Sequence, residues 1–317
     1  MKHLALIFAI ILSLLVAACE KPLEQTVDDL KSADAQVRQK AIDRLSAEGE
    51  QLAPRLASSL STNDDTERDA LFSILRRQGE KALPEMLDKI GYVFRDKKTR
   101  EGFTEYFRSQ GDKGYQALLD ELMKTAEQEA GEATGSGSMV KLAALHHRFE
   151  SLSLILESLD NNVNVGRVPE LLKHSHGPVR TRAAYLLCTK NWQPSGDPDV
   201  AMIYYTHLVG ALACPNVSEP VQDAGRMAAA NFKLFLETEA KYPAGADARY
   251  QVLAAAGTDE VARYLYDQAR ATPNEFLLYN YFLVLHNMQT DLAEKLSAKL
   301  LADPKLGKSL RALDPRL

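Results

Sequence analysis

The sequence predicts an all-α protein, because three features of the chain agree on helices. After the first 19 residues, apolar residues recur every three or four positions, as in the series Leu23, Val27 and Leu30, which is the period of an amphipathic helix. No convincing run of alternating apolar and polar residues, the pattern of a half-buried strand, interrupts this period. Short polar turns such as 32–34 and 62–65 separate the segments and supply residues that cap the next helix.

Residues 1–18 have the pattern of a secretory signal peptide. Lys2 and His3 precede an apolar run, 4–18, that ends in small residues directly before Cys19. These 15 residues fall short of the roughly 20 that span a bilayer as a helix. The cysteine after Val-Ala-Ala resembles the lipobox of bacterial lipoproteins, which implies cleavage before Cys19 and lipid attachment to it. An ordinary signal peptide followed by a chance cysteine is the alternative.

The lipoprotein resemblance predicts a location in the cell envelope. Several fatty chains on one cysteine anchor a protein stably, whereas a single chain does not. In such lipoproteins an Asp directly after the cysteine favours the inner membrane, and here the residue is Glu20. We therefore expect the mature protein at the periplasmic face of the outer membrane. No second apolar run approaches spanning length, so we expect the lipid to be its only membrane attachment, without a transmembrane helix.

The composition is that of an ordinary globular chain and gives no indication of nucleic-acid binding. The 38 Lys and Arg residues are outnumbered by 43 Asp and Glu residues, for a net charge of −5. Charged residues make up 26% and apolar residues 45%, which argues against disorder.

Three segments share a pattern of one helix, a tight turn and a second helix. The clear second helices begin Val37-Arg38 and Val179-Arg180, and a looser one begins Pro220-Val221. Glu67-Arg68 aligns with the first segment only at a 29-residue offset and lacks the valine. The pattern resembles the HEAT repeat, whose second helix often begins Val-Arg-x-x-Ala, and the 42 residues from Val179 to Val221 fit its period of about 40–47 residues.

The HEAT resemblance implies a right-handed α-solenoid of antiparallel helix pairs. In this arrangement the valine fills the gap between paired helices, and the alanine one turn later lets their axes approach. The arginine reaches carbonyl groups or an acid of the adjacent turn. We therefore expect Val179, Ala183 and Leu186 to be buried between helices.

A Gly- and Ser-rich segment, 131–138, divides the helices into two groups. The sequence predicts N-terminal helical repeats over 19–130, a flexible loop or linker over 131–138 and C-terminal helical repeats over 139–317. The segment is either a domain linker or a long loop inside one superhelix. We favour the loop slightly, because Val140 resumes the helical period at once.

Two cysteines besides Cys19 would lie in a compartment that permits disulfides. We nevertheless expect Cys188 and Cys214 to stay unpaired. A predicted helix from about Pro198 to Ala213 would place Cys214 on the order of 20 Å from Cys188. A disulfide needs Cα atoms within about 7 Å of each other.

The sequence contains no motif of a catalytic or cofactor site: HExxH, GxSxG, GxGxxG and the phosphate loop are all missing. Two histidine groups remain. His147 shares a helix face with Glu150, with His146 beside it, and His174 and His176 share one turn. Neither group has the further ligands that a metal site needs, so the sequence predicts no metal and no cofactor.

Basic and aromatic residues are unevenly distributed. A basic cluster is formed by Arg76, Arg77, Lys97, Lys98 and Arg100. Phosphate groups of lipid or lipopolysaccharide are a conceivable target, although a solvated helical surface is the simpler interpretation. Nine of the twelve tyrosines lie from Tyr185 onward, and core packing is the default explanation for most of them. If the protein has a binding groove, we expect it in the C-terminal half.

These observations predict a non-enzymatic scaffold or adaptor that binds an unidentified protein of the cell envelope. Stacked repeats present long surfaces and need no catalytic pocket. The first alternative is a carrier that holds a lipid or peptide in a concave groove. The second is an enzyme whose site is assembled from residues far apart in sequence. A deep apolar cavity would favour the carrier, and converging ionisable groups with shifted pKa values would favour the enzyme.

Overall fold

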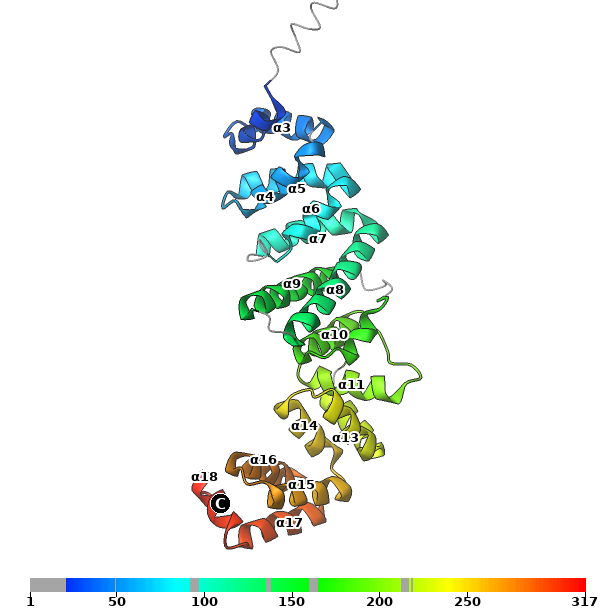
Figure 1. Cartoon of the computed structure of the whole chain (residues 1–317), viewed down its shortest axis with the longest axis vertical. Coiled ribbons are helices and arrows are strands. Elements are labelled where there is room, and N and C mark those ends of the chain that lie inside the picture. Colours follow the sequence, from blue (N-terminus) through cyan, green and yellow to red (C-terminus); the bar gives the residue numbers. More distant parts are fainter. Residues whose placement is uncertain are drawn as a thin grey trace, which may run out of the picture. The chain divides into compact units, whose positions relative to one another are not determined.

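The computed structural model describes residues 21–48, 50–91, 97–134, 138–159, 165–211, 217 and 219–317. Every regular element in these ranges is a helix, which confirms the all-α prediction (Figure 1). Over the same ranges, no helix combines the length and the apolar character that crossing a membrane requires. The chain divides into two compact units, Met1–Glu121 and Leu122–Leu317, and the division falls within helix α8.

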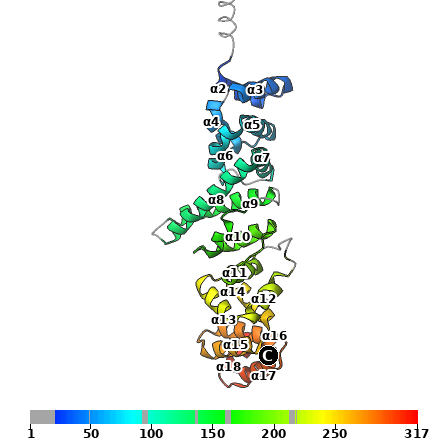
Figure 2. The same cartoon turned by 90° about the vertical axis from the view of Figure 1, so that its right-hand side faces the viewer.

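The first unit consists of short helices in which alternate helices are in contact. α3 packs against α5, α5 against α7, and α4 against α6 (Figures 1 and 2). Fully buried side chains such as Leu45, Leu71 and Phe103 fill the space between them. The elements are α2 (Leu23–Thr26), η1 (Asp28–Lys31), α3 (Ala35–Glu48), η2 (Glu50–Leu52), α4 (Ala53–Ser58), η3 (Ser59–Ser61), α5 (Asp65–Gln78), η4 (Gly79–Ala82), α6 (Leu83–Lys89), α7 (Lys97–Ser109) and the start of α8 (Gly111–Thr134).

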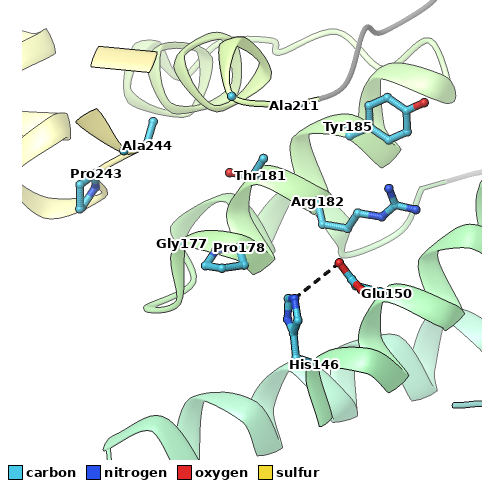
Figure 3. A pocket seen from close by; sticks show the side chains of 12 residues that line it. His146, Glu150, Gly177, Pro178, Thr181, Arg182, Tyr185, Ala211, Pro243 and Ala244 are labelled. Carbon is cyan, nitrogen blue, oxygen red and sulfur yellow. Dashed lines mark ion pairs between the residues drawn. The ribbon is translucent and has the colours of Figure 1, made fainter. Parts of the chain in front are cut away.

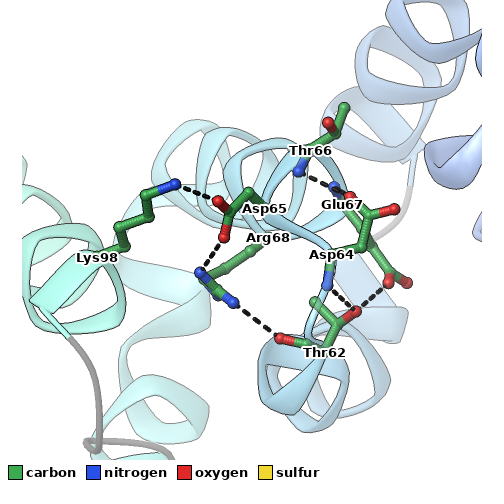
Figure 4. A network of polar contacts seen from close by, with 7 residues as sticks. All are labelled: Thr62, Asp64, Asp65, Thr66, Glu67, Arg68 and Lys98. Carbon is green, nitrogen blue, oxygen red and sulfur yellow. Dashed lines mark hydrogen bonds and ion pairs between the residues drawn. The ribbon is translucent and has the colours of Figure 1, made fainter.

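The turns that lead into α3 and α5 are built alike. The hydroxyl oxygens of Ser32 and Thr62 accept hydrogen bonds of 3.2 Å from the backbone N–H groups of Asp34 and Asp64, two residues later. Both aspartates then cap their helices; Asp64, for example, accepts from the N–H of Thr66 at 2.8 Å (Figure 4). The polar turns therefore have the capping role that the sequence predicts.

An arginine at the fourth position of each helix completes these turns. Arg38 donates to the carbonyl oxygen of Ser32 at 2.6 Å, and Arg68 donates to that of Thr62 at 3.0 Å. Each bond spans six residues, as expected for an arginine that reaches the adjacent turn. Equivalent residues are 30 positions apart, so the 29-residue offset taken from the sequence is wrong by one residue at this arginine.

The valine before the arginine is less consistent than the arginine itself. Val179 is fully buried, together with Ala183 and Leu186, which confirms that prediction. Val37, however, is 36% exposed. The expectation that the valine fills the gap between paired helices therefore holds for α10 and is wrong for α3.

Alternate helices are in contact in the second unit as well. α11 contacts α13, α12 contacts α14, α14 contacts α16, α15 contacts α17 and α16 contacts α18. After the end of α8 the elements are α9 (Met139–Ser158), η5 (Val168–Lys173), α10 (Gly177–Thr189), α11 (Pro198–Val209), α12 (Pro220–Ala230), α13 (Phe232–Lys241), α14 (Ala246–Ala256), α15 (Asp259–Ala271), α16 (Glu275–Asn287), α17 (Asp291–Ala302) and α18 (Leu306–Leu313).

Small residues let α12 and α14 approach closely. Ala224 and Ala228 are fully buried on α12, as the looser repeat suggests. A Cβ atom at Gly225 would lie 2.6 Å from the Cβ of Ala255 and 2.8 Å from its backbone carbonyl carbon. Since backbone atoms cannot move aside easily, only glycine fits at this contact.

Segment 131–138 begins inside a helix. α8 extends to Thr134, so the first four residues of the segment are helical. Ser138 accepts a hydrogen bond from the N–H of Val140 and caps α9. The chain divides into its two compact units earlier, between Glu121 and Leu122.

Cys188 is disulfide-bonded, so the expectation that it stays a free thiol is wrong. The other two cysteines of the sequence, Cys19 and Cys214, lie outside the described residues. The expectation assumed a helix that continued to Ala213. α11 ends at Val209, so the large distance between Cys188 and Cys214 that the longer helix would impose does not apply.

Candidate functional site

Three ionisable side chains from separate elements of the second unit meet at one point. They are Glu129 on α8, His146 on α9 and His176 at the N-cap position of α10. Each offers a ligand atom, and these atoms lie within 4.8 Å of one another. His146 Nδ1 is 3.2 Å and His176 Nδ1 is 2.7 Å from Glu129 Oε1. The two imidazole rings meet edge to face, with their centroids 5.9 Å apart.

The carboxylate of this Glu–His–His cluster is buried and incompletely hydrogen-bonded. The Glu129 side chain is 0% exposed, whereas His146 and His176 are each 29% exposed. Across the described part of the chain, neither Glu129 Oε2 nor His176 Nδ1 has a hydrogen-bond partner. The 2.7 Å approach of His176 is therefore a close contact without hydrogen-bond geometry. An unsatisfied buried polar atom costs about 1–3 kcal/mol, so the cluster calls for a further partner.

His146 completes a short chain of polar contacts. Its hydrogen bond with Glu129 raises the pKa of the imidazole, and partial desolvation opposes this effect. On the other side of the ring, Nε2 lies 3.5 Å from Glu150 Oε1 (Figure 3). The imidazole is thus positioned between two carboxylates.

The turn at 174–176 is a variant of the turns at 32–34 and 62–64. His174 Nδ1 accepts from the N–H of His176 at 3.1 Å, as the hydroxyl oxygens of Ser32 and Thr62 do in their turns. His174 Nε2 lies 2.9 Å from the carbonyl oxygen of Ala126 and donates to it, which ties the turn to α8. His176 takes the position of the capping aspartates but makes no capping bond, and its ring contacts Glu129 instead.

A pocket of about 490 Å³ lies beside the cluster (Figure 3). Its walls come from α9, α10, the end of α11 and the loop before α14. The lining residues are His146, Glu150, Gly177, Pro178, Thr181, Arg182, Tyr185, Gly210, Ala211, Pro243, Ala244 and Gly245. Apolar and small residues dominate, Glu150 and Arg182 add charge, and His146 adds an imidazole. Arg182 is held in place by an ion pair with Glu157.

A buried arginine fixes the walls of this pocket. Arg180 is 2% exposed and donates to the carbonyl oxygens of His174 at 2.7 Å and of Pro243 at 2.6 Å. Its Nε donates to His207 Nε2 at 3.1 Å, and the carbonyl oxygen of Tyr242 lies 3.2 Å from the same nitrogen. Burial, reinforced by the charge of Arg180, lowers the pKa of His207 to about 4. His207 Nδ1 and Thr181 Oγ1 share a hydrogen bond of 3.1 Å.

The structure regroups the histidines that the sequence singled out. One member of each predicted group, His146 and His176, reaches Glu129, which the sequence analysis missed. His147 is 74% exposed, and His174 serves the turn. The sequence offers no local signal for Glu129, because its two partners follow 17 and 47 residues later and meet it only through helix packing.

Other candidate residues are placed as follows. Cys19 lies outside the described residues. In the basic cluster, Arg77 pairs with Asp43 at 2.7 Å and Lys98 pairs with Asp65. These ion pairs favour a surface of mutually paired charges over a phosphate-binding site. Among the C-terminal tyrosines, Tyr204 is fully buried in the core and Tyr185 lines the pocket.

The chain was also compared with known proteins. No family model matches the sequence, and no curated protein is significantly similar to it.

Proposed function

We propose that this protein is a lipid-anchored α-solenoid of the cell envelope that binds a partner protein and catalyses no reaction on it. The observation that carries the proposal is the contact between alternate helices within each unit. This is the packing of helical repeat proteins, whose stacked helices provide extended binding surfaces. The recurring bond from Arg38, Arg68 and Arg180 to the carbonyl group six residues earlier supports a common repeat.

The pocket between α9, α10 and the loop before α14 is the proposed contact point. Pro178, Pro243 and Ala211 give it apolar walls, and Tyr185 adds an aromatic face. Interfaces concentrate binding energy in small apolar pockets surrounded by polar residues, and Arg182 and Glu150 supply such a rim. We infer that it takes an apolar side chain from an exposed segment of the partner.

A carrier of a small ligand is the second candidate, because a volume of about 490 Å³ also falls within the usual range for ligand pockets, about 300–1,000 Å³. Extraction of the purified protein with organic solvent, followed by mass spectrometry, distinguishes the two. A stoichiometric bound lipid or peptide would favour the carrier.

Photocrosslinking in intact cells tests the adaptor proposal. A photoreactive residue at Tyr185 should trap one defined envelope protein, whereas the same residue at Lys233, whose side chain is 85% exposed on α13, should not. Ala211→Trp fills the pocket and should abolish the crosslink from Tyr185. Equal crosslinking from both positions, or a crosslink that survives Ala211→Trp, would contradict this contact point.

The anchor is tested separately. Cys19→Ser should abolish labelling with a fatty-acid analogue and release the protein from membranes, because the lipid is the proposed attachment. Membrane association of this variant that persists through a high-salt wash would contradict a lipid anchor.

A further inference from the structure

We propose that Glu129, His146 and His176 bind a single zinc-class divalent ion at the edge of the pocket. The ligand set is two imidazole nitrogens and one carboxylate oxygen, supplied by α8, α9 and the N-terminus of α10. Three protein ligands of these types with one position left for water or another ligand describe many open zinc sites. Mixed nitrogen and oxygen donors favour Zn²⁺ and its neighbours over Mg²⁺ and Ca²⁺, which prefer oxygen ligands alone.

The interatomic distances suit such an ion. In a tetrahedral zinc site with bonds of about 2.0–2.1 Å, neighbouring ligand atoms lie about 3.3 Å apart. The distance from Glu129 Oε1 to His146 Nδ1 is 3.2 Å, which matches this spacing, and the distance to His176 Nδ1 is 2.7 Å, shorter than the spacing by about 0.6 Å. All three ligand atoms lie within 4.8 Å of one another.

The unsatisfied atoms of the cluster suit a cation-binding role. His176 Nδ1 and Glu129 Oε1 are in contact, yet in the part of the chain that the structure describes this nitrogen has no hydrogen bond. Glu129 Oε2 is buried and has none either. A cation between the nitrogen lone pair and the carboxylate gives these atoms a partner and neutralises a charge that is otherwise costly to bury.

Neighbouring polar groups position the two histidine ligands, as they do in known metal sites. Glu150 Oε1 lies 3.5 Å from His146 Nε2, on the side of the ring that faces away from Glu129. Metal-binding histidines usually donate their other ring N–H to a carboxylate or carbonyl. His174 holds the turn against α8 through Ala126, which places the neighbouring His176.

Comparison of the three turns gives independent support. Asp34 and Asp64 use their side chains to cap α3 and α5. His176 holds the same position before α10 and leaves its helix without a side-chain cap. At this position, then, a capping aspartate is replaced by a histidine whose ring turns towards the buried Glu129. A role as a metal ligand explains this replacement.

Metal titration of the purified full-length protein, without a polyhistidine tag, tests the proposal. Isothermal titration with Zn²⁺ against a competing chelator should show one tight site per chain. Co²⁺ in its place should give the intense visible absorption of a four- or five-coordinate ion, which exposed six-coordinate sites lack. Binding no tighter than that of scattered surface groups, or a six-coordinate Co²⁺ spectrum, would overturn the proposal.

Matched variants locate the ion. Glu129→Gln, His146→Gln and His176→Asn should each weaken Zn²⁺ binding by roughly 100-fold or more, since even outer-shell changes cost about 10–100-fold. His147→Gln, which alters an exposed neighbour on the same helix, should bind as the wild type does. Equal loss in His147→Gln would place the ion elsewhere. Circular dichroism checks that each variant is folded. If a variant does not fold, the Co²⁺ spectrum of the wild type alone tests whether the protein has the proposed metal site.

Discussion

The guanidinium of Arg180 donates a 2.7 Å hydrogen bond to the carbonyl oxygen of His174, six residues earlier in the chain. Arg38 and Arg68 make the same bond in the first unit. The three sites differ in burial: Arg180 is 2% and Arg68 7% exposed, while Arg38 is only half-buried. One contact therefore occurs in environments where its contribution to stability should differ.

Arg180→Met should lower the free energy of unfolding by about 2–4 kcal/mol, because it leaves several buried acceptors without a donor. Arg38→Met removes the equivalent bond near solvent and should cost less than about 1 kcal/mol. Urea unfolding followed by circular dichroism measures both. Equal costs would show that the bond, rather than its burial, determines the effect.

His207 should make stability depend on pH. Its folded-state pKa of about 4 lies below the ordinary value of about 6.5, so unfolding takes up a proton between these values. The contribution is complete above about pH 6.5 and decreases by about 3 kcal/mol as the pH falls towards 4. His207→Gln, compared with wild type by urea unfolding across this range, should show a correspondingly shallower decline. His147→Gln is the exposed control, and an unchanged slope in His207→Gln would contradict the assignment.

Gly225→Ala should destabilise the protein by about 1–3 kcal/mol, because the added methyl group would meet the backbone of Ala255 on α14. Gly131→Ala is the matched control within a helix of the same unit, since a Cβ atom there meets nothing within 4 Å. It should be neutral or stabilising by up to about 1 kcal/mol. Thermal unfolding compares the two, and similar effects would show that α12 and α14 can separate without cost.

Cys188 should resist alkylation in unfolded protein until a reductant is added. Its partner is expected to be Cys214, because the lipoprotein pattern assigns Cys19 to the lipid. Mass spectrometry of peptides prepared without reductant should find Cys188 linked to Cys214. A freely alkylated Cys188 would contradict the disulfide.

Local pattern was sufficient to predict much of the fold. The helical period identified the buried face of α10 around Val179. The predicted helix start at about Pro198 agrees with the start of α11, where Asp197 accepts from the N–H of Asp199 at 2.9 Å. These features depend only on residues within one helix or turn. Because such residues are close in sequence, their spacing predicts the feature.

The candidate site could not be predicted in the same way. Glu129, His146 and His176 are brought together by the packing of three helical elements, which no spacing in the sequence encodes. The disulfide of Cys188 was missed for a related reason, since the expected length of α11 was too great. Helix ends and long-range contacts depend on tertiary packing, so they require the structure.

The continuity of α8 affects how the protein can be dissected into fragments. The two compact units divide between Glu121 and Leu122, in the middle of an uninterrupted helix whose side chains Leu118 and Met123 are buried on either side of the division. A fragment that starts or stops there would have frayed ends, because a new helix terminus leaves four N–H or four carbonyl groups without partners. A fragment of the second unit should therefore begin at Gly111 and carry the whole of α8. A fragment that began in the loop after α8 would lose this helix.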